Sequence, residues 1–456
     1  QGCGQCRRCL EACPTGALID RHSMYQGRLT DLDHHPSMCV DCSIGCTRDV
    51  LTRDNRLVRI DNIWDESING GLLCEKGRYT PLLDKRARVE NPLVRVDGVQ
   101  KAVDWEDALS VAAAQIKAHG SDELSASISS RQGLESQAAF YDLFHNSFQL
   151  PKMKLLAADE TAGAAVALAE EIGAFESDLT AIDEADAIIV LGADVLDKHQ
   201  VAGFMVRRQA AMGVDLVLAN KEDSHLGDIA DSLMKYVGED FAKVIQMLAA
   251  ARRQDAVEES LQIGQALGFK AHEAQAMLAK VASWQNPVFV VGKQATSSVP
   301  AFLKQVVELA KAMNGKVVCL KGGIATLPGA LMGYELASPN GSGAKVAFIA
   351  IGDAEVCPRA KAEFEAADYR IVASAYQNEL TEKAEVVLPT AVWTEVSEHY
   401  MASDGRVMEN PRAVQPSADV KTTVELVAAL AEKLNTSVSS DWQAFLKKEA
   451  NPVAMR

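Results

Sequence analysis

The stretch Cys39-Val40-Asp41-Cys42-Ser43-Ile44-Gly45-Cys46 spaces three cysteines as C-x2-C-x3-C. A fourth, Cys74, follows after 27 intervening residues, within Gly70-Gly71-Leu72-Leu73-Cys74-Glu75-Lys76-Gly77-Arg78-Tyr79. Cysteine thiolates at short intervals are the ligands of iron–sulfur clusters and of zinc. We interpret these four as one ligand set for a [4Fe–4S] cluster, and the segment around them as a small domain that brings them together.

The residues between Cys46 and Cys74 indicate how the fourth thiol returns to the other three. Arg56-Leu57-Val58-Arg59-Ile60 alternates polar and apolar side chains, which is typical of a half-buried strand. This run predicts one strand of a small hairpin within residues 49–62. The pair Gly70-Gly71 then favours a turn just before Cys74. The chain therefore goes out, folds back and returns the fourth thiol.

A second cysteine group stands at the start of the chain, where the pattern C-x2-C-x2-C-x3-C-P matches the spacing of bacterial ferredoxins. In two-cluster ferredoxins the last cysteine of such a run ligates the neighbouring cluster. Cys13 therefore either serves a cluster whose other ligands lie upstream or closes the cluster of its own group. We favour the first, because the chain begins almost inside the motif. Zinc and unmetallated thiols are the alternatives to iron. The expected ligands are Cys3, Cys6, Cys9 and Cys13.

Composition limits the class of protein. The 456 residues are too many for one ordinary core and predict two to four structural units. Eight of the ten cysteines fall in the first 74 residues, which favours metal ligation in a reducing cytoplasm over a disulfide framework. The formal net charge of −16 argues against nucleic acid as the main partner. No stretch approaches the roughly 18 apolar residues of a spanning helix, so we expect any membrane contact to run through partners.

Beyond residue 100 the pattern alternates apolar strands with helix-length segments, which predicts an α/β fold with a parallel, doubly wound sheet. The predicted helices are Asp104–His119, Val201–Met212, Glu239–Ala251 and Pro300–Met313. The predicted strands are Ser125–Ser129, Ala187–Gly192, Asp215–Ala219, Val288–Gly292, Lys316–Leu320, Val346–Gly352, Arg370–Ser374 and Val386–Leu388.

Two of these strands form a weak internal repeat, since each ends in glycine followed closely by a carboxylate. The pairs are Gly192 with Asp194 and Gly352 with Asp353. Doubly wound folds bind ligands at this end of their strands, so the four residues are candidates for binding a ligand. The simpler interpretation is that glycine permits a tight turn from strand to helix.

The cysteine pattern and the Gly70–Tyr79 segment together resemble the N-terminal cluster domain of the molybdopterin oxidoreductase superfamily. The resemblance covers roughly Cys3 to Leu434. It implies small N-terminal iron–sulfur domains followed by two related nucleotide-binding α/β domains, one inserted in the other. We expect a ferredoxin-like segment at residues 1–36, a [4Fe–4S] domain at 37–90, the α/β domains at 91–435 and a tail at 436–456. Further segments that resemble the family in order are Asn91–Arg95, Asp104–Leu109, Ala384–Pro389 and Asp404–Val407.

The resemblance also implies roles for single residues. In the family, the residue that corresponds to Lys76 lies between cluster and pterin and is thought to relay electrons; an ordinary lysine that neutralises an anionic cluster is the alternative. Active members carry a Cys, selenocysteine, Ser or Asp ligand to Mo or W after the first helix of the α/β part. In Leu150–Thr161 only Asp159 offers such a group, and its register differs from the family's. Active members also carry a further C-terminal β-rich domain, for which the residues after Leu434 are too few, so we expect Mo/W-molybdopterin to be absent.

A member that lacks the metal ligand and the C-terminal domain resembles the G-type subunit of bacterial NADH–quinone oxidoreductase (complex I). The positions of Cys3, Cys6 and Cys9, by contrast, resemble those of cysteines in NAD-linked formate dehydrogenase chains. The favoured hypothesis is an iron–sulfur electron-transfer subunit of an NADH-linked oxidoreductase, relaying single electrons between two or more [4Fe–4S] clusters. Its partners would be flavin/NADH-binding and other iron–sulfur subunits. It would be cytoplasmic, held at the inner face of the membrane only through partners. The alternatives are a catalytic Mo/W-bis(molybdopterin guanine dinucleotide) formate dehydrogenase subunit and a non-redox scaffold.

Overall fold

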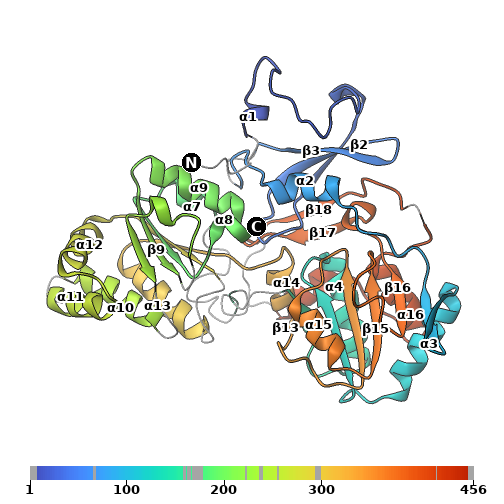
Figure 1. Ribbon diagram of the computed structural model, residues 1–456. Helices are drawn as coiled ribbons and strands as arrows, with labels where there is room; N and C mark the ends of the chain where they lie inside the picture. Colours follow the sequence, from blue (N-terminus) through green and yellow to red (C-terminus); the bar gives the residue numbers. More distant parts are fainter. Residues whose placement is uncertain are drawn as a thin grey trace.

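A computed structural model describes residues 8–64, 68–157, 161, 166, 178–220, 223–235, 240–253, 256–292, 299–416 and 418–449. Figure 1 shows a small N-terminal part above two α/β units that lie side by side. In the ranges described, no helix is long and apolar enough to cross a membrane.

The N-terminal part contains a three-stranded antiparallel sheet in the order β1-β2-β3. Its strands are β1 (Asp33–Met38), β2 (Thr47–Arg53) and β3 (Arg56–Asn62). The β2–β3 turn places Asp54 and Asn55 at φ of 50° and 59°, a conformation that Asp and Asn tolerate better than most residues. The strand predicted at residues 56–60 is therefore present.

An eight-stranded sheet forms the larger α/β unit, in the order β13-β7-β6-β14-β15-β16-β4-β5. The predicted parallel, doubly wound sheet is confirmed, and one edge adds antiparallel strands, since β4 pairs antiparallel with β16 and with β5. These two strands are a short hairpin, which the apolar patterning did not reveal. In sheet order the strands are Glu335–Leu336, Lys154–Leu156, Leu124–Ser129, Val346–Gly352, Tyr369–Ser374, Val386–Pro389, Leu93–Val96 and Val99–Ala102.

A five-stranded parallel sheet forms the second α/β unit, in the order β10-β9-β8-β11-β12. The chain leaves the larger sheet after β7 and returns to it at β13, and the five strands lie in the sequence between these two. In sheet order they are Ser232–Lys235, Asp215–Asn220, Ala187–Leu191, Pro287–Val291 and Lys316–Cys319. The residue ranges expected for the domains stay a prediction.

Helices cover both faces of the larger sheet. Successive residues of β14 point to opposite sides: Phe348 joins a core with α3 and α4, whereas Ile349 joins a core with α15. This is the doubly wound arrangement that the sequence predicts, and each predicted helix is present. The helices near this sheet are α3 (Trp105–Ala118), α4 (Leu134–Tyr141), α14 (Thr326–Leu331), α15 (Pro358–Glu365), α16 (Thr423–Lys433) and α17 (Trp442–Glu449). The others are α1 (Arg8–Glu11), α2 (Glu75–Leu83), α7 (Thr180–Asp183), α8 (Val195–Lys198), α9 (Gln200–Ala211), α10 (Asp240–Arg252), α11 (Val257–Ala266), α12 (Ala271–Ser283) and α13 (Val299–Ala312).

A hairpin of β17 (Glu398–Met401) and β18 (Val407–Asn410) joins the N-terminal part to the larger sheet (Figure 1). The Asn410 side chain accepts from Met38 N at 2.7 Å and donates to Met38 O at 2.9 Å. These bonds satisfy the buried backbone groups of Met38 at the end of β1, directly before Cys39.

Candidate metal centre

The loop between β1 and β2 carries three of the four cysteines of the Cys39–Cys74 group. Cys39 and Cys46 are each 4% exposed, and Cys39 N donates to Cys46 O at 2.8 Å, which closes the loop on itself. Gly45 lies in this loop at φ 60°, where an added Cβ would stand 2.7 Å from Met38 Sδ. Only glycine fits both the backbone conformation and the space, so the loop is tightly determined.

Cys74 is the N-cap of α2, and its Sγ accepts from Gly77 N at 3.4 Å. Gly77 lies close to two of the sulfur atoms. A Cβ added to it would stand 3.1 Å from Cys39 Sγ and 3.7 Å from Cys74 Sγ. The start of a helix carries partial positive charge and free N–H groups, which favour the thiolate form. The start of α2 thus brings Cys74 to the three cysteines of the β1–β2 loop.

Burial raises the pKa of each of the four thiols. The pKa of Cys39 rises to about 12, because burial and the neighbouring Asp41 and Cys74 outweigh the nearby Arg48. For Cys42 and Cys46, burial comes first and the other thiols of the group raise the pKa further. Four thiolates are therefore stable here only when cations replace their protons, which is how metal binding and deprotonation are coupled.

The donor set fits an iron–sulfur cluster. A single zinc ion would hold its four thiolates about 3.8 Å apart. A [4Fe–4S] cluster has no such requirement, because its thiolates bind different iron atoms. Ligation by Cys39, Cys42, Cys46 and Cys74 stays a prediction that this geometry supports.

The other cysteine group is described only in part, since Cys3 and Cys6 lie outside the described residues. Cys9 is exposed on α1, and Cys13 is half-buried. Hydrogen bonds from Thr15 and nearby backbone groups lower the pKa of the Cys13 thiol to about 7. The segment between them is anchored on α2, because Glu11 forms an ion pair with the buried Arg78. Which cluster Cys13 serves is not decided by these contacts.

Lys76 also lies on α2, two residues after Cys74. Its Nζ donates to Asp197 O at 3.0 Å, so the side chain reaches from the small domain to α8 beside the five-stranded sheet. Its positive charge is among the influences that lower the pKa of Cys74, although burial dominates and raises it. The predicted relay role of Lys76 remains a prediction.

The carboxyl end of β14 is filled by the chain's own side chains. Gly352, at φ 63°, lies against Gln132, whose Nε2 would stand 1.6 Å from an added Cβ. Asp353 accepts from Arg131 Nε at 3.0 Å and from Trp393 N at 3.3 Å. The carboxylate expected to face a nucleotide is thus bound by an arginine and a backbone N–H of the same chain.

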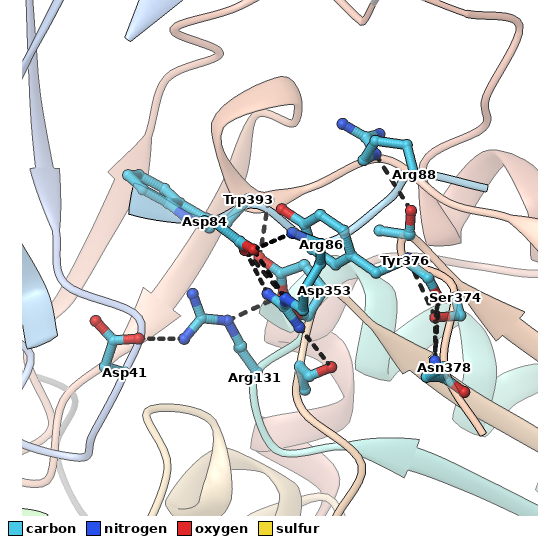
Figure 2. Close-up of polar contacts among 12 residues, drawn as sticks. Asp41, Asp84, Arg86, Arg88, Arg131, Asp353, Ser374, Tyr376, Asn378 and Trp393 are labelled. Carbon is cyan, nitrogen blue, oxygen red and sulfur yellow. Dashed lines mark hydrogen bonds and ion pairs between the residues drawn. The ribbon is translucent and has the colours of Figure 1, made fainter. Parts of the chain in front are cut away.

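Figure 2 shows Arg131 between Asp353 and Asp41, the latter in the cysteine loop. Burial alone would raise the pKa of Asp41, but the charges of Arg131 and Arg48 outweigh it and hold that pKa below its ordinary value. The ion pair of Asp41 with Arg131 therefore ties the cysteine loop to the larger sheet, and the pair with Asp353 holds the same guanidinium in place.

Two further arginines continue this polar network. The Arg86 guanidinium donates from Nε and Nη2 to the Asp84 carboxylate and from Nη2 to Asp353 O at 3.1 Å. It also stacks on the Tyr376 ring, with Cζ 3.8 Å from the ring centre (Figure 2). Arg88 donates two bonds of 2.8 Å to Glu395. These guanidinium groups serve partners within the chain.

Gly192 and Asp194 occupy the corresponding end of β8 in the five-stranded sheet. Gly192 takes φ 64° and its N donates to Ala219 O at 2.9 Å. Asp194 Oδ2 pairs with His225 Nδ1 at 2.5 Å, and its Oδ1 is buried without a hydrogen-bond partner among the described residues. The structure thus places this pair and the Gly352–Asp353 pair on different sheets, and a nucleotide role for either stays a prediction. The candidate molybdenum ligand, Asp159, lies outside the described residues.

Sequence reasoning missed two buried charges. Arg48 on β2 is 0% exposed beside Cys39, and only its position two residues after Cys46 signals this. Glu398 is 5% exposed and accepts from Gly133 N at 3.0 Å and from Ser136 Oγ at 2.5 Å at the start of α4. Burial raises the pKa of Glu398 to about 7. No local pattern marks this glutamate, since its partners lie some 260 residues away.

Comparison with known proteins gives the same two parts. The family described as molybdopterin oxidoreductase matches residues 88–433, and the molybdopterin oxidoreductase Fe4S4 domain matches residues 33–81. NADPH-Fe(3+) oxidoreductase subunit alpha of Geobacter sulfurreducens is 30% identical over 264 residues, which are 56% of this chain and 31% of that protein. The G-type subunit of NADH-quinone oxidoreductase from Pseudomonas putida is 27% identical over 441 residues, 87% of this chain and 47% of that protein. The chain thus spans less than half the length of these relatives.

A solved structure has a similar fold. Acetylene hydratase from Pelobacter acetylenicus superposes with a TM-score of 0.65 at 12% sequence identity, over 88% of this chain and 69% of that one. At this identity the likeness concerns the fold alone, and it confirms the α/β architecture expected from the sequence.

Proposed function

The chain belongs to the molybdopterin oxidoreductase family, and we propose that it is an electron-transfer subunit that relays single electrons through [4Fe–4S] clusters and has no catalytic molybdenum. The observation that carries the proposal is the convergence of four cysteines, two buried and two half-buried, where the β1–β2 loop meets the start of α2. A [4Fe–4S] cluster supplies one-electron chemistry when bound. Cys39, Cys42, Cys46 and Cys74 would hold one cluster, and Cys3, Cys6, Cys9 and Cys13 would serve another.

The chain's own contribution is the environment of the thiolates. The β1–β2 loop and α2 hold the ligands in a buried site, where hydrogen bonds to sulfur and the exclusion of water set the reduction potential. Gly77 N, at 3.4 Å from Cys74 Sγ, is one such donor. Lys76 adds a positive charge near the same sulfur.

The absence of a molybdenum centre is supported by the carboxyl end of the larger sheet. A pterin nucleotide needs free donors and acceptors there, but Asp353, Gly352 and Glu398 are already in contact with side chains or backbone of the same chain. The residues described at this edge do not fit the cofactor. The alternative, a catalytic Mo/W formate dehydrogenase subunit, depends on Asp159.

Partners follow from the relatives, which are named as subunits of NADH-quinone and NADPH-Fe(3+) oxidoreductases. We propose that flavin/NADH-binding and other iron–sulfur subunits deliver and receive the electrons. On this proposal the protein works in the cytoplasm and meets a membrane only through these partners.

Metal analysis and EPR test the proposal. The purified protein should contain iron and give a signal after reduction by dithionite, with negligible molybdenum or tungsten. Cys42→Ser should lose about four iron atoms and one EPR signal. The control is Cys357→Ser, because Cys357 Sγ accepts from Ala360 N as the N-cap of α15, a role that serine fills.

Three results would contradict the proposal. Full iron content in Cys42→Ser would remove that thiolate from the ligand set. Stoichiometric molybdenum or tungsten would support the catalytic alternative. An iron-free, EPR-silent native protein would support a non-redox scaffold.

A further inference from the structure

Arg48 carries a positive charge that is entirely enclosed by the protein. It lies on β2 and is 0% exposed. Its Nη1 donates to Gly77 O at 2.9 Å and approaches Cys39 Sγ at 3.5 Å, within reach of a hydrogen bond to sulfur. The guanidinium therefore lies between the cysteine loop and α2, in contact with one of the thiols.

The rest of the guanidinium is poorly satisfied by the chain. Its Nε and Nη2 are buried and make no hydrogen bond with the described residues. No carboxylate there forms an ion pair with it, since the nearby Asp41 is paired with Arg131. Asp41 lies close enough for the Arg48 charge to help lower its pKa, but its carboxylate is bound by Arg131. A buried guanidinium with two unsatisfied nitrogens is unfavourable, so this arrangement favours a further anion close by.

An aromatic ring covers one face of the same group. The Arg48 Cζ lies 4.1 Å from the centre of the Trp393 ring, at a distance typical of cation–π contact. Trp393 follows β16 and its N donates to Asp353 at 3.3 Å. The larger α/β unit thus helps to fix the orientation of Arg48, and the unsatisfied N–H groups are left at the edges of the guanidinium.

We propose that Arg48 is a positioning residue that raises the reduction potential of the cluster held by Cys39, Cys42, Cys46 and Cys74. This inference rests on the proposed function. Four thiolates make the loaded site anionic, and one more electron adds one negative charge without breaking a bond or requiring a proton. A buried cation in contact with Cys39 stabilises the reduced state more than the oxidised state, because attraction grows with charge.

The competing interpretation is purely structural, with Arg48 serving to anchor α2 through Gly77 O. The reduction potential separates the two, because an anchor does not change it once the cluster is in place. Arg48→Gln removes the charge but keeps a donor, and Arg48→Lys keeps the charge but loses the fork. The matched control is Arg59→Gln on β3, whose arginine is 26% exposed and paired with Asp61.

The test is a redox titration followed by EPR on the intact protein. The signal of this cluster is identified as the one missing from Cys42→Ser. For Arg48→Gln we expect the equilibrium constant for reduction to fall about tenfold, which lowers the midpoint potential by about 59 mV for one electron. Arg48→Lys should stay within about a threefold change, and Arg59→Gln should match the native protein.

Equal potentials in Arg48→Gln and Arg59→Gln, with full iron in both, would overturn the inference while leaving the proposed function intact. Equal shifts in Arg48→Gln and Arg48→Lys would overturn it as well, because charge would not be the cause. If Arg48→Gln fails to retain iron, Arg48→Lys decides: iron and a near-native potential support the inference, and loss of iron contradicts it. A native protein without iron would instead fail the proposed function itself.

Discussion

Replacing Glu398 with glutamine should make the protein more stable at alkaline pH than the native sequence. The carboxyl is 5% exposed, and burial raises its pKa to about 7, while the negative charges of Glu135 and Asp353 raise it further. Bonds from Ser136 and from Gly133 N lower that pKa, but they do not offset burial. Glutamine keeps a neutral group of the same shape, with an oxygen for Gly133 N and an N–H for the serine hydroxyl.

The sign follows from proton binding in the two states. Between pH 4.5 and about 7 the folded protein holds a proton on Glu398 that the unfolded chain has released, so native stability falls as pH rises through this range. The full effect of a pKa raised from 4.5 to about 7 is about 3 kcal/mol. Relative to the native protein, Glu398→Gln should therefore gain about 2.5 kcal/mol between pH 5 and pH 8.

Urea unfolding followed by tryptophan fluorescence measures this gain, with native and variant proteins compared at each pH. The control is Glu382→Gln, which makes the same substitution at an exposed glutamate. The quantity compared with the prediction is the change with pH in the stability difference between Glu398→Gln and the native protein. Curves for Glu398→Gln and native protein that stay parallel from pH 5 to pH 8 would refute the reasoning.

Two other substitutions probe the edge of the larger sheet. Gly352→Ala should cost about 3 kcal/mol, because the added Cβ would meet Gln132 Nε2 at 1.6 Å and the backbone stands at φ 63°. The control is Gly343→Ala, because Gly343 has a similar φ of 69° but open space around it. An equal loss of stability in thermal denaturation of the two variants would contradict the steric part of the argument. Arg131→Met should lower the free energy of unfolding by about 3 kcal/mol, because it leaves Asp41 and Asp353 without their shared cation (Figure 2). This is the low end of the usual loss for a buried ion pair, since the arginine side chain is 20% exposed and solvent screens it in part. Calorimetry at pH 7 measures the second loss, and an unchanged unfolding temperature would show that the two ion pairs contribute nothing.

The network in Figure 2 also supports the proposal that this member of the family has no catalytic molybdenum. The same strand ends that suit a nucleotide are present, but Asp353 binds Arg131 and Arg86 approaches from the segment after α2. An arginine and a carboxylate that satisfy each other leave little for a ligand to bind. The fold is that of the family, whereas the polar groups at this edge are used for holding the domains together.

The sequence alone determined the parts of this protein whose signal is local. Cysteine spacing identified the Cys39–Cys74 group. Continuous apolar runs such as Val346–Gly352 located the central strands of the larger sheet and all but the edge strand β10 of the smaller one, because burial on both faces requires uninterrupted apolar residues. Helices such as Trp105–Ala118 followed from their length and periodicity. These features depend on neighbours within a few positions, which a sequence displays directly.

Only the tertiary structure decided which distant groups meet. Arg48 is buried beside a thiol and under Trp393 although 345 positions separate the two residues, and Glu398 reaches the start of α4 from the far end of the chain. The antiparallel edge β4–β5 likewise depends on which strand lies next to it. The energies of such contacts come from burial and from charge at short range, and neither quantity exists until the chain has folded.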